Sequence, residues 1–551
     1  MTGETSAPPL ARTTNGNGDL SNPFAQERRV ARATAVQPPV RSREIAAVAA
    51  IIILCDLTIY RGHGFAGYAM LFVALPVLFV WGAFRPRAGT ASWTTGVMLL
   101  LLAARLVWCG SALAVAAGFA LVAAFVMALS GQTPFVAETA VFASQSIASG
   151  YRRFLHYGRA SATSSLTRLP LLNVGLPLLA LLVFGTVFVL ANPDLVASFS
   201  EALESVVQHV RAWLLHMSVG EVAFWIAAAW ISTGLLRQAS SSGGMSEPAF
   251  PEVTADVATE TAPTTTEASR LYPAFRNTLV TVIVLFAVYL VFEFRTLWFR
   301  EFPKGFYYSG YAHEGAAWLT FALALATVFL SFVFRGGVLG DPRLPQLRRL
   351  GWIWSAENFV LAAAVYHRMQ IYVDFNGMSP MRTVGLFGMT AVVAGFVLVL
   401  WKIAKGRSFG WLVRRQLWAL ALTIYLFALT PVDALVTEYN VRRIMAGDPA
   451  ASVQISVHPI SSEGVLRLEP LLNCDDATIR EGVRALLAER EDEAELSAVR
   501  NQQLGWTTYQ VSDEILLERL RAGRGRWADY RDPKLRGAAL KRFHDYAYQW
   551  Y

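Results

Sequence analysis

Charged residues are scarce in this sequence. Asp, Glu, Lys and Arg make up 16% of its 551 residues, whereas hydrophobic residues make up 54%, and the mean hydropathy is +0.39. A soluble globular protein carries roughly 25% charged residues. A buried core does not account for so large a deficit, so the composition indicates that lipid surrounds much of the protein surface.

Cysteine, histidine and the familiar catalytic signatures are rare or missing. The three cysteines lie far apart, and the eight histidines are scattered. Their spacing excludes a disulfide framework and offers no metal-binding motif. The sequence also lacks a phosphate-binding GxxxxGK[ST], an HExxH and a GxSxG motif. We therefore predict no cofactor and no metal site, and no catalytic residue is indicated.

Long apolar runs dominate what is present. A helix that crosses a membrane needs about 20 mostly apolar residues. The sequence predicts an all-α polytopic membrane protein with about eleven such helices, at residues 45–60, 66–84, 91–108, 111–129, 171–191, 221–236, 277–297, 315–334, 353–373, 384–403 and 415–436. The expected partner of this surface is a lipid bilayer.

Changes in composition divide the chain into five segments. Residues 1–43 lack apolar periodicity and predict a disordered tail. Residues 44–237 and 273–440 form two membrane domains, of about six and about five helices. Residues 238–272, rich in Ser, Gly, Thr and Pro, predict a flexible linker between them. Residues 441–551 predict a small, mainly helical extramembrane domain.

The extramembrane domain shows local signals for several elements. Val453–Val457 reads as a short strand, and Thr478–Glu481 as a capping box that opens a helix. Ser512 is placed to cap a second helix. Asp532 followed by Pro533 predicts the start of a third helix, because proline is favoured in a first helical turn. The domain is a possible site for a protein partner.

Basic residues set the expected orientation. The net charge is +8, but Lys and Arg lie in short loops between apolar runs rather than on one basic surface. This distribution argues against a nucleic-acid partner. Cytoplasmic loops of membrane proteins are enriched in Lys and Arg. The first 43 residues are rich in arginine, and the loops expected on the same side of the membrane are the basic ones. We therefore predict a cytoplasmic N-terminus and an extracytoplasmic C-terminal domain.

Ionisable residues within membrane helices are costly and are therefore candidates for function. The most polar predicted helix is 353–373, and other polar residues fall at the same expected membrane level. Together they predict a polar pocket at the outer interface, lined by His313, Glu357, His367, Arg368, Asp374, Asp433 and Asn440. The alternative is that these residues join helices to one another. Arg105, in the third helix, is expected to reach an interface or to pair locally.

Short motifs in the second half follow one order, and they resemble a bacterial family of multi-pass membrane proteins of unknown function, DUF4173 and the closely related DUF4153. They are Tyr311-Ala-His-Glu-Gly315, Tyr366-His-Arg368 with Arg382, and Pro431-Val-Asp433 with Asn440 and Arg443. The resemblance covers roughly residues 275–445. His313 departs from it, because the family usually has Arg there. The resemblance implies a membrane location and a membrane fold, and no known activity. We expect the protein in the bacterial inner membrane.

Three classes of function remain open. The leading interpretation is a non-catalytic envelope scaffold or sensor. The alternative is a transporter or lipid-handling protein that uses the polar pocket. A membrane enzyme requires a carboxylate or histidine pair in hydrogen-bonding reach, which Asp374, Asp433 and His367 provide only if their helices are neighbours. An open cavity among the pocket residues would favour the second and third classes, and a closed, paired cluster the first.

Overall fold

A computed structural model describes residues 41–83, 86, 89–163, 218–240, 265–298, 308–334 and 341–550. Within these ranges, only the backbone is described for residues 151–163, 265–271, 297 and 308–314. All elements in the described ranges are helical. The predicted helix 171–191 and the N-terminal tail up to residue 40 lie outside the described residues, as does most of the predicted linker.

The first helical group contains α2 (Ser42–Cys55), the π-helical turn η1 (Asp56–Tyr60), α3 (Phe65–Gly82), α4 (Thr90–Cys109), α5 (Ala112–Leu129), α6 (Val136–Thr163) and α9 (Val219–Ser240). Buried apolar side chains of α2 to α5, such as Ile51, Phe72, Leu102 and Val126, form its core. Glu44 at the start of α2 pairs with Arg237 at the end of α9. At the other end, Tyr60 is hydrogen-bonded to Ser218, 2.5 Å away.

The second helical group contains α10 (Thr265–Glu293), the π-helical turn η3 (Phe294–Trp298), α11 (Tyr308–Val333), α12 (Leu344–Asn376), α13 (Pro380–Lys405) and α14 (Phe409–Leu429). Its apolar cores include Leu330, Trp354 and Phe396. Helix α14 joins the two groups. Arg414 pairs with Glu138 of α6 at 2.7 Å, and the Tyr425 hydroxyl donates to the Met98 carbonyl of α4 at 3.1 Å.

Eight helices in the described ranges are long and apolar enough to cross a membrane. They are α3, α4, α5, α9, α10, α11, α13 and α14, and each contains or overlaps a predicted span. The count of eleven is not confirmed. The predicted span 45–60 is α2 continued by η1, and 353–373 lies in the more polar α12. The predicted span 415–436 is broken at Thr430 and Pro431, since α14 ends at Leu429 and α15 starts at Val432.

The C-terminal region is built from short and long helices. They are α15 (Val432–Met445), η5 (Pro449–Ser452), α16 (Val453–Ser456), α17 (Ser462–Val465), η6 (Glu469–Asn473), α18 (Ala477–Leu504), η7 (Trp506–Thr508), α19 (Val511–Gly523), η8 (Arg524–Arg531) and α20 (Pro533–Tyr548). Buried Leu468, Ile479, Val483 and Phe543 form its core. Helix α15 crosses the predicted boundary at residue 441, and Val441 also lies in this core.

Local predictions for this region had mixed outcomes. The predicted strand 453–457 is wrong, because α16 covers Val453–Ser456. The N-cap of α18 is Asp476, two residues before the predicted Thr478, and its carboxylate accepts from Thr478 and Ile479 amides. Ser512 lies inside α19 and is not its cap. The start of α20 is confirmed, since Asp532 caps it and Pro533 is its first residue.

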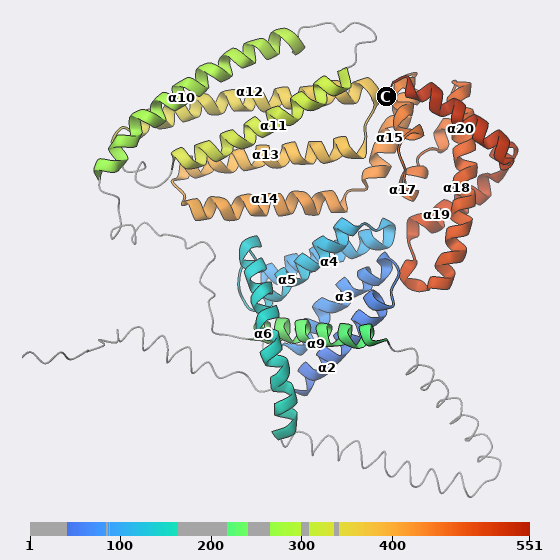
Figure 1. Cartoon of the computed structure of the whole chain (residues 1–551), viewed down its shortest axis with the longest axis horizontal. Coiled ribbons are helices and arrows are strands. Elements are labelled where there is room, and N and C mark those ends of the chain that lie inside the picture. Colours follow the sequence, from blue (N-terminus) through green and yellow to red (C-terminus); the bar gives the residue numbers. More distant parts are fainter. Residues whose placement is uncertain are drawn as a thin grey trace, which may run out of the picture.

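The C-terminal domain lies against one end of both helical groups (Figure 1). Helix α18 runs crosswise to the membrane-crossing helices and extends from α20 and η6 to η7, which packs on α3. Its 28 residues span about 42 Å at the usual rise per residue. The Tyr546 hydroxyl of α20 donates to Asp476 at 2.5 Å, and burial together with this carboxylate raises the pKa of Tyr546 to about 12.

Candidate functional site

Six of the seven residues predicted to line a pocket fall into two groups in the structure. Asp374, Asp433 and Asn440 lie where the second helical group meets the C-terminal domain. Glu357, His367 and Arg368 lie along α12, within the helical group. For His313, only the position in α11 is described.

Asn440 attaches the turn between α12 and α13 to α15. Its Nδ2 donates to the Met378 carbonyl, and its Oδ1 accepts from the Met378 amide, both at 2.7 Å. Its side chain is buried. Gly377, which precedes Met378, has φ +90°, and a Cβ there would stand 2.5 Å from Asn440 Oδ1. The Asn440 carboxamide therefore pairs with the Met378 backbone as a neighbouring peptide group would, and its closeness requires glycine at position 377.

Arg443 adds a second attachment beside Asn440. Its guanidinium donates to the carbonyls of Val373 and Asp374 at 2.5 and 2.6 Å, and it also pairs with Asp448. These carbonyls belong to the last turn of α12, where backbone donors run out; the Val373 carbonyl also accepts from the Gly377 amide at 2.8 Å. The Asp374 carboxylate is exposed and accepts from Gln370 at 2.7 Å.

Asp433 orients the segment before α17. Its Oδ2 accepts from the Ser461 amide at 3.2 Å. Nearby, Gly464 of α17 packs so closely that a Cβ there would lie 2.9 Å from Thr437 Oγ1. Asp433 thus connects the first turn of α15 to the segment that carries Glu463.

Arg368 makes a buried ion pair with Glu293 of α10. Its Nε and Nη2 donate to the two carboxylate oxygens at 2.7 and 2.6 Å, and both side chains are at most 3% exposed. Tyr289 also donates to Glu293 at 2.9 Å. Gly315 leaves room for this guanidinium, because a Cβ there would lie 2.0 Å from Arg368 Nη1. The pair joins α10, α11 and α12.

The other two α12 candidates differ in their surroundings. The His367 ring stacks on Trp298, with ring centroids 4.6 Å apart. Glu357 is half-buried, and its Oε2 has no hydrogen-bond partner within the part of the chain that the structure describes. The described residues include no group of three His, Cys, Asp or Glu side chains arranged to hold a metal ion.

Arg105 of α4 makes an ion pair between the first helical group and the C-terminal domain. Its two terminal nitrogens each donate to one oxygen of Glu463 at 2.8 Å, and Trp108 donates to the same carboxylate at 3.2 Å. The Arg105 and Glu463 side chains are 13% and 3% exposed. Arg105 was expected to reach an interface or to pair locally; it is paired, with a residue 358 positions away in the sequence.

Two further hydrogen bonds complete this contact. The Gly110 amide donates to Gln510 Oε1 at 2.7 Å, and the His63 amide donates to Thr507 Oγ1 at 3.1 Å. Gly64 lies tightly against the backbone of Thr508. The loop between η1 and α3 and the loop between α4 and α5 therefore both bind the C-terminal domain.

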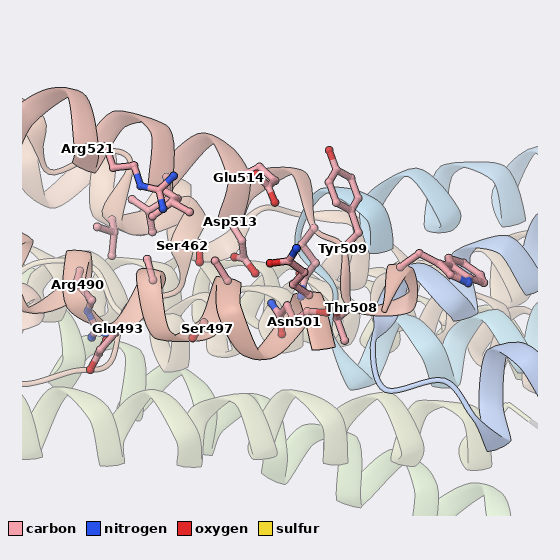
Figure 2. A pocket seen from close by; sticks show the side chains of 18 of the residues that line it. Ser462, Arg490, Glu493, Ser497, Asn501, Thr508, Tyr509, Asp513, Glu514 and Arg521 are labelled. Atoms are coloured by element: carbon pink, nitrogen blue, oxygen red, sulfur yellow. Dashed lines mark hydrogen bonds and ion pairs between the residues drawn. The ribbon is translucent and has the colours of Figure 1, made fainter. Parts of the chain in front are cut away.

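A groove of about 590 Å³ opens between α18 and α19 beside these contacts. Figure 2 shows Ser497 and Asn501 of α18 across from Asp513 of α19. Arg490 pairs with Glu493 at 2.6 Å, and Arg521 with Glu495 at 3.7 Å. Other lining residues include Ser462, Gln502, Trp506, Tyr509, Gln510 and Glu514. Polar and apolar side chains thus share the wall of the groove, and Trp506 and Tyr509 add two aromatic rings.

Comparison with protein families gives one match. The family described as a domain of unknown function (DUF4153) matches residues 46–467. The chain belongs to this family. Comparisons with curated proteins and with solved structures find no match.

The DUF4153 range contains both helical groups and ends just after α17. It therefore includes both partners of the Arg105–Glu463 pair and of the Arg368–Glu293 pair. Helices α18, α19 and α20 follow it. The predicted resemblance over 275–445 is confirmed, and the match also covers the first helical group.

In this DUF4153 protein, sequence reasoning missed the acidic partners of Arg368 and Arg105, which are Glu293 and Glu463. Glu293 is the one carboxylate in the apolar run 277–297, and an acid in such a run signals a buried cationic partner. Glu463 offered no such signal, because it lies in a short polar segment. Its role becomes visible only when the C-terminal domain is placed against α4.

Proposed function

We propose that this protein is a membrane-embedded scaffold or sensor whose helical body holds the C-terminal domain in a fixed position for a protein partner. The observation that carries the proposal is the attachment of this small domain to both helical groups. Arg105–Glu463 binds it to the first group, and Asn440 and Arg443 bind it to the second. A change in the packing of either group would therefore reach the domain.

Transport has weaker support. A transporter needs a polar path near the middle of the membrane. The polar groups that were candidates for such a path mostly contact other protein groups. Arg368 is paired with Glu293, and Asn440 uses both ends of its carboxamide on one backbone residue. These contacts favour a structural role for the polar residues.

The proposed location is the bacterial inner membrane, with the N-terminus in the cytoplasm and the C-terminal domain outside. The first group has Glu44–Arg237 at one end and Tyr60–Ser218 at the other. His63, next to Tyr60, contacts the C-terminal domain, so the Glu44 end faces away from it. Helix ends on the side away from the C-terminal domain carry basic residues, including Arg43 in α2, Arg349 in α12 and Lys405 in α13. The positive-inside rule supports this orientation.

The groove between α18 and α19 is the proposed partner site. Asp513 and Glu514, at the start of α19, make no ion pair with other described residues, whereas Arg490 and Arg521 are paired. The groove therefore has an excess of negative charge at one end. A partner segment that carries Lys or Arg there and hydrogen-bonding groups for Asn501 and Gln510 would be complementary.

The test is site-specific photo-crosslinking in cells that express the full chain. A photoreactive residue at Ser497, in the groove, is expected to give a protein adduct of one defined mass. The double variant Asp513→Lys with Glu514→Lys is expected to remove that adduct, because it reverses the charge of the site. Arg500, exposed on α18 outside the groove, is the control position. The same adduct from Arg500, or one that survives charge reversal, would contradict the proposal.

A further inference from the structure

A second hollow, of about 570 Å³, lies between the segment 455–460, α18 and α20. Four side chains that can carry positive charge line it, and Glu489 is the one carboxylate among its lining residues. We call it the basic hollow. The four are His458, Arg490, Lys541 and His544.

The charges of the basic hollow are only partly neutralised. Arg490 pairs with Glu493, but its Nε is buried and has no hydrogen-bond partner among the described residues. Lys541 pairs with Asp545 one turn along α20, and both side chains are more than half exposed. Such exposed pairs contribute little energy and separate readily. Lys541 can therefore turn toward a ligand.

Arg382 supplies a further positive charge close to the hollow. Its guanidinium is 5% exposed, donates to the Gly377 carbonyl and to Asn376 Oδ1, and stacks on Tyr372 at 3.7 Å. None of its contacts in the described part of the chain is a carboxylate, and its Nε lacks a partner. Burial and this neighbouring guanidinium lower the pKa of His458, so its imidazole contributes a hydrogen-bonding group rather than a further positive charge. A buried cation without a counter-charge raises the affinity of the adjoining space for an anion.

The position of the basic hollow suits a ligand at the membrane surface. Two residues after α20, which forms one wall, the Trp550 carbonyl accepts from Asn376 Nδ2 at the end of α12, at 3.1 Å. Its segment 455–460 follows Gln454, which donates to the Asn376 carbonyl at 2.9 Å. The hollow thus lies near the start of α13, one of the helices long and apolar enough to cross a membrane.

We propose that the basic hollow binds the phosphate group of a phosphate ester. A phosphate has several acceptor oxygens that suit donors from three different segments, as Lys, Arg and His provide here. The volume of 570 Å³ is within the range of about 300–1,000 Å³ typical of small-ligand sites. The hollow therefore has room for an organic group attached to the phosphate. Such an ester is either a lipid headgroup or a soluble compound.

The test uses the full chain in lipid nanodiscs and two probes. Calorimetry with glycerol 3-phosphate measures the soluble ester, and native mass spectrometry of chains released from phosphatidylglycerol or phosphatidylcholine nanodiscs measures the lipid. The double variant Lys541→Gln with His544→Gln changes two exposed side chains and preserves the core. It is expected to weaken binding at least tenfold. Arg542→Gln, on the same helix but paired with Glu481 outside the hollow, is the control and is expected to change binding less than twofold.

The two arms distinguish the sources of the phosphate. Binding of glycerol 3-phosphate identifies a soluble ester, and selective retention of phosphatidylglycerol identifies a lipid. Failure of both probes to bind the wild-type chain would overturn the proposal. Equal losses in the double variant and in Arg542→Gln would overturn it as well.

Discussion

At the scale of single residues, the molecule depends on buried charges that are paired across long sequence separations. Arg368–Glu293 and Arg105–Glu463 each join elements that the apolar pattern alone would leave free to shift. Burying a charge is expensive, and its removal from a buried pair leaves the partner uncompensated. The identity of the partner therefore determines which helices come together.

Replacement of Glu463 by Gln tests the contact with the first group. The change leaves Arg105 without a counter-charge and is expected to cost roughly 3 kcal/mol. Hydrogen exchange of α17 and η7 should then accelerate by on the order of 100-fold, since each 1.4 kcal/mol is a factor of ten. The measurement is hydrogen exchange with mass spectrometry on the full chain in nanodiscs.

The matched control is Glu438→Gln. Glu438 pairs with two exposed residues, Arg442 of α15 and Arg467, which follows α17. Exposed pairs contribute about 0–1 kcal/mol. Exchange should therefore remain close to that of the wild type. Similar acceleration in both variants would show that Glu463 has no special role.

At the scale of elements, hydropathy located the membrane helices well and the small elements poorly. Eight predicted spans correspond to helices of sufficient length and apolarity, because about 20 apolar residues leave few alternatives. The predicted strand Val453–Val457 is instead helical over Val453–Ser456, and Val453 and Ile455 pack in the core of the C-terminal domain. Such a short segment takes its conformation from its surroundings.

Helix caps and polar residues likewise differ in how far the sequence predicts them. Asp532 before Pro533 was readable because both residues favour one position in a helix. For α18, the sequence pattern predicts a cap at Thr478, but the structure has Asp476 as the N-cap. Among the pocket candidates, the polar character of α12 was evident, but the pairing of Arg368 with α10 depends on how the helices pack.

The turn between α12 and α13 provides a prediction at this scale. Gly377→Ala should destabilise the protein by about 1–3 kcal/mol, because φ +90° with extended ψ is nearly exclusive to glycine. The added Cβ would also collide with Asn440 Oδ1. The measurement is the thermal unfolding midpoint of the full chain in one detergent.

Gly406→Ala is the comparison for this variant. Gly406 also has a positive φ, +61°, but nothing lies within 4 Å of a Cβ there. It should lower the midpoint less than Gly377→Ala does. An equal or larger decrease for Gly406→Ala would contradict the role given to the Asn440 contact.

At the scale of the whole molecule, one small domain connects two groups of membrane helices. Helix α18 extends between them, and α14 provides a second connection through Arg414 and Tyr425. The two groups and their attached domain are therefore expected to respond to disturbance as one body. This coupling is the physical basis of the scaffold or sensor proposal.

The most direct test of this account is a disulfide between His63→Cys and Thr507→Cys, in a chain whose three native cysteines are replaced and which carries a protease site between residues 241 and 264. The backbone of His63 contacts the Thr507 side chain, so oxidation in native membranes should keep the two fragments joined after cleavage. His63→Cys with Lys534→Cys, which is in α20, should not do so. If the fragments of the first variant separate as readily as those of the second, the domain is not docked on the first helical group, and the account fails.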